Sequence, residues 1–172
     1  GGVACEYLLV DNGSTDGSVD DVAREFPQVR IVRSAQNSFG HAFNQGLAAS
    51  TGDFVLFVNN DVRCTSGWFL PLYETLRADR RLAGVQSTVL FDDGRINSLG
   101  GEDLGDFYFR DRGFGASRGE EQALRAEPFF LSGASVLYRR SLLTEHGGAD
   151  EDFIFYGEDV DLGIRLRGAG YG

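Results

Sequence analysis

Three short apolar segments, separated by helical patterns, constrain the fold more than any other feature of this sequence. Residues 19–26 place their apolar side chains at helical spacing, and residues 41–50 form a second short helical pattern. Short apolar runs bounded by turn-forming residues are typical of buried strands. Strands that alternate with helices predict an α/β fold with a largely parallel sheet. The predicted strands cover residues 7–10, 29–34 and 54–58.

Two of these predicted strands end on polar side chains. The third runs straight into Asn59, Asn60 and Asp61, and the first runs into Asp11 and Asn12. Ligands of open α/β sheets bind outside the carboxyl ends of the strands. We therefore expect these side chains at one rim of the sheet, where a nucleotide and its metal ion would sit. The alternative is that they are turn residues that bond their own backbone.

The last helical pattern, at residues 158–168, begins with Glu158, Asp159 and Asp161. Acids in a first turn and arginines in a last turn complement the helix dipole, which accounts for part of the pattern. It does not account for the aromatic-rich segment 152–157, which would shield a carboxylate from water and adjust its pKa. A carboxylate in such a place is a candidate general base.

The remaining segments predict less. Ser66 is expected to cap a helix that follows it, and residues 84–99 are expected to form a strand, a turn and a second strand. Residues 100–127 show no clean period. In the last helix, Val160, Ile164 and Leu166 are expected to face the core.

Composition excludes several classes of partner. A net charge of −10 at pH 7 argues against nucleic acid and against an anionic membrane surface, because both attract basic patches. Cys5 and Cys64 are too few for a disulfide framework, so we expect both to be reduced and the protein to be cytoplasmic. No apolar run approaches the ~20 residues that span a bilayer.

Four motifs, taken in order, carry a resemblance: LLVDNGSTDGSVD, NSFGHAFNQGLAASTGDFVLFVNNDV, FFLSGASVLYRRSLL and GGADEDFIFYGEDVDLGIRLRGAGY. Their order and spacing are similar to those of the family 2 inverting glycosyltransferases of the GT-A fold, and the subgroup they resemble is the bacterial rhamnosyltransferase-like enzymes. The resemblance covers residues 11–171 and implies one catalytic domain over residues 1–172, with a Rossmann-like, mostly parallel sheet flanked by helices.

The resemblance implies roles for the polar rim. Asp11 would face the nucleobase of a nucleotide-sugar donor, with Asn12 and Ser14 beside it. Asn60 would also contact the nucleotide. Asp61 matches the last acid of the family's Asp-x-Asp motif and would bind the Mg²⁺ or Mn²⁺ ion that bridges the donor diphosphate.

The resemblance also implies an acceptor side. Asp159, paired with Glu158, matches the catalytic base that deprotonates the acceptor hydroxyl. Gly133 and Ala134 match the segment that lines the acceptor. A loop around Arg110, rich in glycine, arginine and aromatic residues, would form an acceptor or lid loop, and the alternative is a solvated loop anchored by its aromatic side chains.

Three departures from the family pattern stand out. Asn59 replaces the first acid of the Asp-x-Asp motif, so the ion would be held mostly by Asp61 and the diphosphate. Ala149 stands where the family usually has an aromatic residue. The family's first strand, which lies in the middle of the sheet, is missing, so we expect a fragment that is partial at both ends. Bared sheet edges would favour a homodimer.

Two hypotheses of function follow. The first is an inverting glycosyltransferase that moves a sugar from a UDP- or dTDP-linked donor to a hydroxyl of a saccharide or lipid-linked saccharide during cell-surface polysaccharide synthesis. Such an enzyme would be cytoplasmic or peripheral at the inner face of the membrane, and this fragment of it could be inactive. The alternative is a non-catalytic nucleotide-binding or interaction module on the same scaffold, which the missing strand and Asn59 favour.

Overall fold

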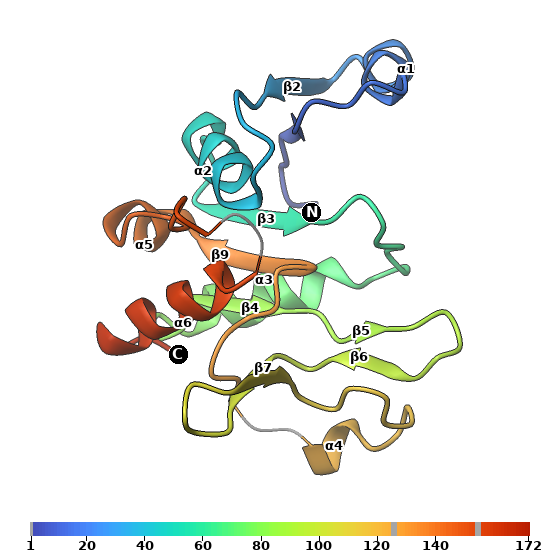
Figure 1. Ribbon diagram of the computed structural model, residues 1–172. Helices are drawn as coiled ribbons and strands as arrows, with labels where there is room; N and C mark the ends of the chain where they lie inside the picture. The colour runs from blue at the N-terminus through green and yellow to red at the C-terminus, as the bar shows by residue number, and fades with distance from the viewer. Residues whose placement is uncertain (1, 125–126, 154–155) are drawn as a thin grey trace.

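Strands and helices alternate through the first half of the protein, as the sequence predicts (Figure 1). The computed structural model describes residues 2–124, 127–153 and 156–172. In this described part of the chain, no helix is both long enough and apolar enough to cross a bilayer. The helices are α1 (Ser18–Glu25), α2 (Phe39–Ala49), α3 (Phe69–Ala78), α4 (Glu121–Leu124), α5 (Arg140–Glu145) and α6 (Glu158–Gly168).

The central strands form two separate sheets. Strands β1 (Tyr7–Asp11) and β2 (Val29–Arg33) pair in parallel. In the other sheet β9 (Ser135–Arg139) lies between β3 (Phe54–Val58) and β4 (Gly84–Gln86) and runs antiparallel to both. The antiparallel β9 is a difference from the largely parallel sheet that alternating strands and helices suggest.

Two hairpins occupy the stretch between β4 and β9. The predicted hairpin is confirmed as β5 (Val89–Leu90) paired with β6 (Ile96–Ser98). A second antiparallel pair, β7 (Gly101–Asp103) with β8 (Phe109–Asp111), lies where the sequence shows no clean period. Strands of three residues are too short to produce a readable alternation of apolar and polar side chains.

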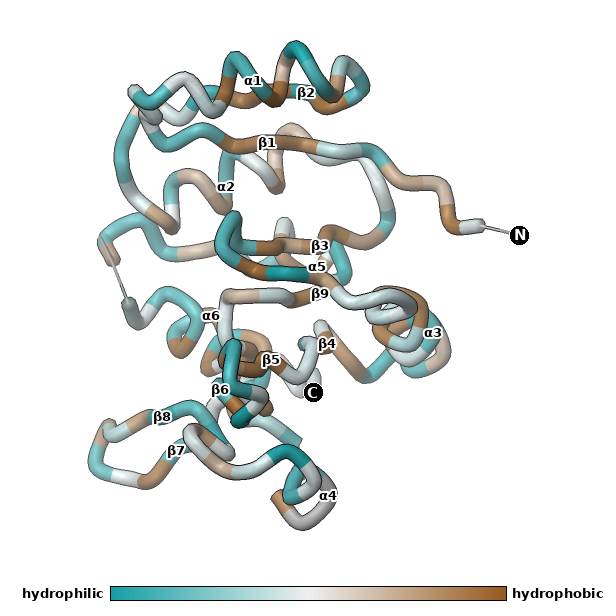
Figure 2. The backbone as a smooth tube through the Cα atoms, turned by 90° about the vertical axis from the view of Figure 1, so that its right-hand side faces the viewer, coloured by the Kyte–Doolittle hydropathy of each residue, from teal (hydrophilic) through white to brown (hydrophobic). Residues whose placement is uncertain are grey.

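Helix α2 bridges the two sheets. Figure 2 shows it between β1 and β3. A Cβ atom at Gly46 would lie 3.2 Å from Cγ2 of Val10 in β1 and 3.9 Å from a ring atom of Phe57 in β3. On the same helix, Phe43 stacks on Phe57 with ring centroids 3.8 Å apart. The main core continues from here through Val136 and Tyr138 of β9 to the buried faces of α5 and α6.

Two local predictions are wrong. Ser66 does not cap a helix, because α3 begins at Phe69 after Trp68, and no side chain caps its first turn. Ile164 does not face the core: it is 47% exposed, and α6 packs through Leu162 and the expected Leu166. Leu162 and Leu166 lie one turn apart on one face of α6, so Ile164, midway between them in the sequence, points toward solvent.

Candidate active site

A large cleft opens at the carboxyl end of β3. The exposed Asp61 lines it together with Asn59, and the cleft has a volume of about 1110 Å³. Ala134, just before β9, also lines the cleft, and its carbonyl accepts a hydrogen bond from the Asn59 N–H at 3.0 Å. Trp68, which precedes α3, adds an aromatic side chain to the same cleft.

A second, much smaller cavity surrounds Asp159. Its volume is about 20 Å³, and Glu158 and Gly133 also line it. Gly133 lines this cavity, and the next residue in the chain, Ala134, lines the cleft. The structure thus places Asp159, Glu158 and Gly133 in the cavity, and Ala134 and Asp61 in the cleft.

The start of α6 places Asp159 in its cavity. Gly157 has a φ of 101° at the helix N-cap, a left-handed conformation that glycine adopts without steric cost. A Cβ atom there would lie 2.8 Å from the ring of Phe153. The turn therefore depends on glycine, and it directs the first residues of α6 toward the aromatic side chains of α2 and β3.

The environment of Asp159 raises its pKa to about 6. Burial is the largest cause, followed by the negative charges of Glu158 and Asp111. The Val160 N–H donates to Oδ1 of Asp159 at 2.8 Å and opposes the shift without cancelling it. Near neutral pH the carboxylate is mostly ionised and still basic enough to accept a proton, which suits a general base.

The end of β1 has a different character. Oδ1 of Asp11 accepts a hydrogen bond from the Ser14 N–H at 2.8 Å, and Oδ2 lies 3.5 Å from the guanidinium of Arg33. These partners, with Ser14 as the largest cause, lower the pKa of Asp11. Asn12 donates to the Ser38 carbonyl at 3.3 Å. In this structure Asp11 therefore has the contacts of a turn residue, whose side chain bonds the backbone of its own turn.

Several predicted site residues lie outside both the cleft and the cavity. Asp11, Asn12 and Ser14 line neither, and the exposed Asn60 lines neither. Arg110 belongs to the β7–β8 hairpin, where its guanidinium bonds Glu102 at 2.6 Å. The structure therefore places Arg110 in a hairpin ion pair and not on the acceptor side of the cleft.

Residues 3–147 match the model described as "Glycosyl transferase family 2". The chain belongs to this family.

Curated relatives agree with this family 2 assignment. The N-acetylglucosaminyl-diphospho-decaprenol L-rhamnosyltransferase of Mycobacterium tuberculosis is 32% identical over 188 residues, which covers 95% of this chain and 61% of that protein. The O-antigen biosynthesis protein RfbC of Myxococcus xanthus is 26% identical over 182 residues, or 96% of this chain and 14% of that protein. The chain thus spans less than two thirds of either relative.

Solved structures confirm the GT-A fold. The mannosyltransferase PcManGT from Pyrobaculum calidifontis, in complex with GDP-Man and Mn²⁺, superposes with a TM-score of 0.67 at 21% identity, covering 96% of this chain and 44% of that one. GalNAc-T7, with UDP, GalNAc and Mn²⁺, gives a TM-score of 0.71 at 14% identity, covering 96% of this chain and 35% of that one. At these identities the likeness establishes the fold alone.

The donor set of this family 2 chain fits a metal ion only in part. Within the described ranges, no group of three His, Cys, Asp or Glu side chains could hold an ion. Asp61 offers a single exposed carboxylate on the wall of the cleft. Mg²⁺ is typically held by one or two carboxylates together with substrate phosphates. The residues present therefore fit an ion that arrives with a diphosphate, and they do not form an independent metal site.

Sequence reasoning missed three residues around Asp159. Asp111 is close enough for its charge to raise the pKa of Asp159, and one of its oxygens is buried without a hydrogen-bond partner in the described chain. Asn44 and Glu151 bond each other beside the cavity wall. An amide within an apolar helical pattern was the available signal for Asn44. No sequence signal pointed to Asp111.

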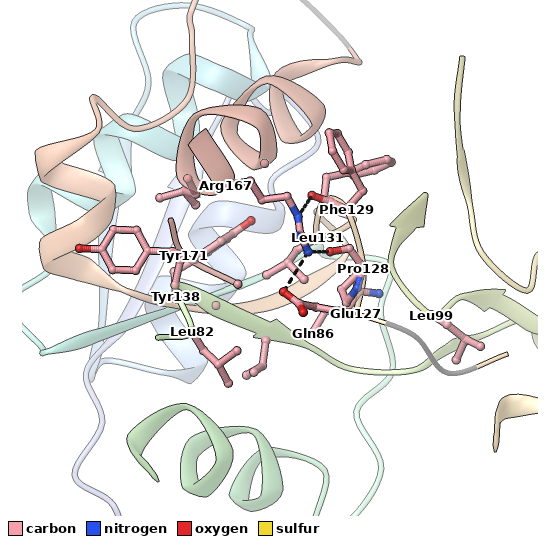
Figure 3. A pocket seen from close by; sticks show the side chains of 17 residues that line it. Leu82, Gln86, Leu99, Glu127, Pro128, Phe129, Leu131, Tyr138, Arg167 and Tyr171 are labelled. Atoms are coloured by element: carbon pink, nitrogen blue, oxygen red, sulfur yellow. Dashed lines mark hydrogen bonds and ion pairs between the residues drawn. The ribbon is translucent and has the colours of Figure 1, made fainter. Parts of the chain in front are cut away.

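A third cavity lies on the other side of Tyr138. It has a volume of about 240 Å³, and Figure 3 shows its largely apolar wall, with Tyr138 and Leu131 contributing. Both residues also line the Asp159 cavity. At its rim, Arg167 of α6 donates to the carbonyls of Phe129 and Pro128 and pairs with the Glu127 carboxylate (Figure 3). The arginine is therefore occupied in fixing the segment that leads into β9.

Proposed function

We propose that this chain carries the catalytic residues of an inverting glycosyltransferase that moves a sugar from a UDP- or dTDP-linked donor to an acceptor hydroxyl. Two observations carry the proposal together: a half-buried carboxylate, Asp159, with a pKa of about 6, and a cleft that holds Asp61. A group with this pKa can take a proton near neutral pH. The cleft is large enough for a nucleotide sugar and part of an acceptor.

The chemistry is a single displacement. Asp159 removes the proton from the acceptor hydroxyl as the hydroxyl oxygen forms a bond to the anomeric carbon of the donor sugar. The bond from that carbon to the nucleoside diphosphate breaks, and the diphosphate leaves with the bonding electrons. Direct attack from the opposite face inverts the configuration at the anomeric carbon. A positioned general base typically contributes ~10²–10⁴-fold to the rate.

Asp61 would hold a Mg²⁺ or Mn²⁺ ion on the donor side. Such an ion, when bound, neutralises negative charge on the leaving diphosphate. Asn59 presents an amide where a second carboxylate would strengthen an ion site, so Asp61 is the one acid of the segment 59–61. Ion binding is then expected to depend on the nucleotide.

The acceptor would be a saccharide or a lipid-linked saccharide. One oxygen of Glu158 and one of Asp111 are buried without a hydrogen-bond partner among the described residues. Neighbouring hydroxyl groups of a sugar would satisfy such oxygens. The mycobacterial relative, an N-acetylglucosaminyl-diphospho-decaprenol L-rhamnosyltransferase, supports a lipid-linked acceptor and rhamnosyl transfer. A place at the inner face of the membrane stays an expectation from the sequence. The relatives give no support to a homodimer, which stays an expectation from the sequence.

Transfer by the full-length chain tests the proposal. UDP- and dTDP-sugars are incubated with Mn²⁺ and a lipid-diphosphate sugar acceptor, and the released nucleoside diphosphate and the glycosylated product are both measured. We expect product with the inverted anomeric configuration, and none with Asp159→Asn. Wild-type activity in Asp159→Asn would exclude Asp159 as the base.

The alternative is a non-catalytic nucleotide-binding module. Asn59 favours this function. The contacts of Asp11 favour it too, because its carboxylate already interacts with Ser14 and Arg33. Calorimetry with UDP and dTDP separates the two functions. Binding that strengthens with Mn²⁺ supports the transferase, whereas binding that ignores the metal, with no turnover by the full-length chain, supports the module.

A further inference from the structure

Helix α2 holds the chain segment that precedes Asp159. The side-chain amide of Asn44 forms two hydrogen bonds with the backbone of Ala149: Nδ2 donates to the carbonyl at 2.8 Å, and the Ala149 N–H donates to Oδ1 at 2.9 Å. A Cβ atom at Gly148 would lie 2.2 Å from Oδ1 of Asn44, so the segment approaches the helix too closely for a larger residue. The two-way amide contact fixes the position of Ala149 against α2.

Glu151 strengthens the same attachment. One carboxylate oxygen accepts a hydrogen bond from Nδ2 of Asn44 at 2.8 Å, and the other lies 2.9 Å from Nδ1 of His41. The hydrogen bonds from His41 and Asn44 lower the pKa of Glu151, so this carboxylate is ionised at neutral pH and can only accept. Nδ1 of His41 must then carry the proton. Both oxygens of Glu151 are thus matched to donors on α2.

This attachment forms part of the wall around Asp159. Ala149 is 4% exposed and lines the Asp159 cavity. Phe39 and Phe43, which lie on the same helix as Asn44, line it too. Helix α2 therefore lines the cavity directly with two aromatic side chains. It also holds Ala149, another part of the cavity wall, in place through hydrogen bonds. If Ala149 moved away from α2, the half-buried carboxylate of Asp159 would become more exposed to water.

We propose that Asn44 and Glu151 are positioning residues that hold the wall of the Asp159 cavity in place and so keep the carboxyl group of Asp159 half-buried. They act through Ala149, and they touch neither donor nor acceptor. Only the catalytic consequence rests on the proposed function, because the partial burial of Asp159 is a property of the folded chain.

The proposal has a measurable electrostatic consequence. Burial is the largest cause of the raised pKa of Asp159. The titratable groups that face it are Glu158 on its own helix, Asp111 on β8 and Tyr138 on β9. Substitution of Asn44 or Glu151 changes none of these groups. Opening the wall should therefore return the pKa of Asp159 toward the ordinary carboxyl value of about 4.

Carbon-13 NMR of the aspartate carboxyl groups in this chain measures that pKa directly, with Asp159→Asn to assign the signal. Asn44→Ala and Glu151→Gln are compared with the control Gln45→Ala on the same helix. Glutamine presents one oxygen and one amide group to two donors, so Glu151→Gln breaks one of the hydrogen bonds without changing the size of the side chain. We expect Asp159 to titrate near 6 in the wild type and the control, and nearer 4 in the two variants.

The proposal is overturned if both variants fold, as judged by circular dichroism, and Asp159 titrates as in the wild type. If Asn44→Ala does not fold, the isosteric Glu151→Gln decides the question alone. In the full-length chain, we expect both variants to lower kcat about tenfold with the donor KM unchanged, and to move the acidic limb of the kcat profile to lower pH. A wild-type chain that transfers no sugar would defeat the proposed function, yet the NMR titration would still decide the role of Asn44 and Glu151.

Discussion

Two carboxylates at the edge of this fold, Asp11 and Asp159, differ in what surrounds them. The side chain of Asp11 is 3% exposed, yet its pKa is lowered, because the backbone N–H of Ser14 and the guanidinium of Arg33 stabilise its negative charge. Asp159 is enclosed by apolar walls beside two further acids, and its pKa is raised to about 6. The comparison teaches that burial alone does not set the pKa of an acid. The donors enclosed with it decide whether it is a structural anion or a base.

The largest effect expected from this comparison is on catalysis. Asp159→Asn should reduce sugar transfer by the full-length chain by ~10²–10⁴-fold, because the amide cannot accept the proton of the acceptor hydroxyl. Asp11→Asn should retain most of the transfer rate, because Asp11 lines neither the cleft nor the cavity. Steady-state rates of both variants measure the contrast, and equal losses would remove it.

The same two acids should have opposite effects on stability, and the larger belongs to Asp159. Its folded pKa lies above its unfolded value, so the wild type loses stability as the pH rises from about 4 to about 6. At pH 7, Asp159→Asn should raise the free energy of unfolding by about 3 kcal/mol. Urea denaturation of both chains at pH 4 and pH 7 measures the difference. A variant less stable than the wild type at pH 7 would contradict the raised pKa.

Asp61 sharpens the comparison as a third kind of carboxylate, exposed and placed in the cleft. Asp61→Asn should weaken the Mn²⁺-dependent part of UDP or dTDP binding about tenfold, since a charge-assisted contact to an ion is lost. Binding without metal should not change. Calorimetry with and without Mn²⁺ checks both statements, and an equal loss in the absence of metal would assign Asp61 to the nucleotide itself.

The smallest expected effect concerns Asp11. Its folded pKa is lowered, so its contribution to stability is present above the unfolded value of about 4 and is lost as the pH falls through the folded value. Asp11→Asn should therefore be less stable than the wild type at pH 7, and the gap should close in acid. Thermal unfolding at a series of pH values measures the gap. A gap that stays constant down to the lowest pH would show that Ser14 and Arg33 do not stabilise the ionised form.

The sequence predicted those parts of the site that lie where regular elements begin or end. The helix at residues 158–168 is confirmed as α6, and the polar end of the strand at residues 54–58 lies in the cleft. Such predictions succeed because apolar periodicity fixes the element, and the element fixes the position of its terminal residues. Asp159 and Asp61 were found in this way.

Contacts between distant parts of the chain could not be predicted. Asn44 and Ala149 are 105 residues apart, and an amide in a helical pattern does not reveal its partner. The β7–β8 hairpin, with the Glu102–Arg110 ion pair, was also missed, because its short strands have no readable period. The orientation of Ile164 failed for a related reason, since the face that α6 buries is chosen by the surface it packs on.

The position of α2 between two sheets has a consequence for how this protein unfolds. Strands β1 and β2 share no ladder of hydrogen bonds with β3, β9 and β4. The two sheets are joined through α2 and through Glu6, whose carboxylate accepts hydrogen bonds from Thr51 and Gly52. Amide protons in β1 and β2 should therefore exchange with deuterium through a local opening. Those of β9, which is paired with a strand on each side, should exchange only on global unfolding.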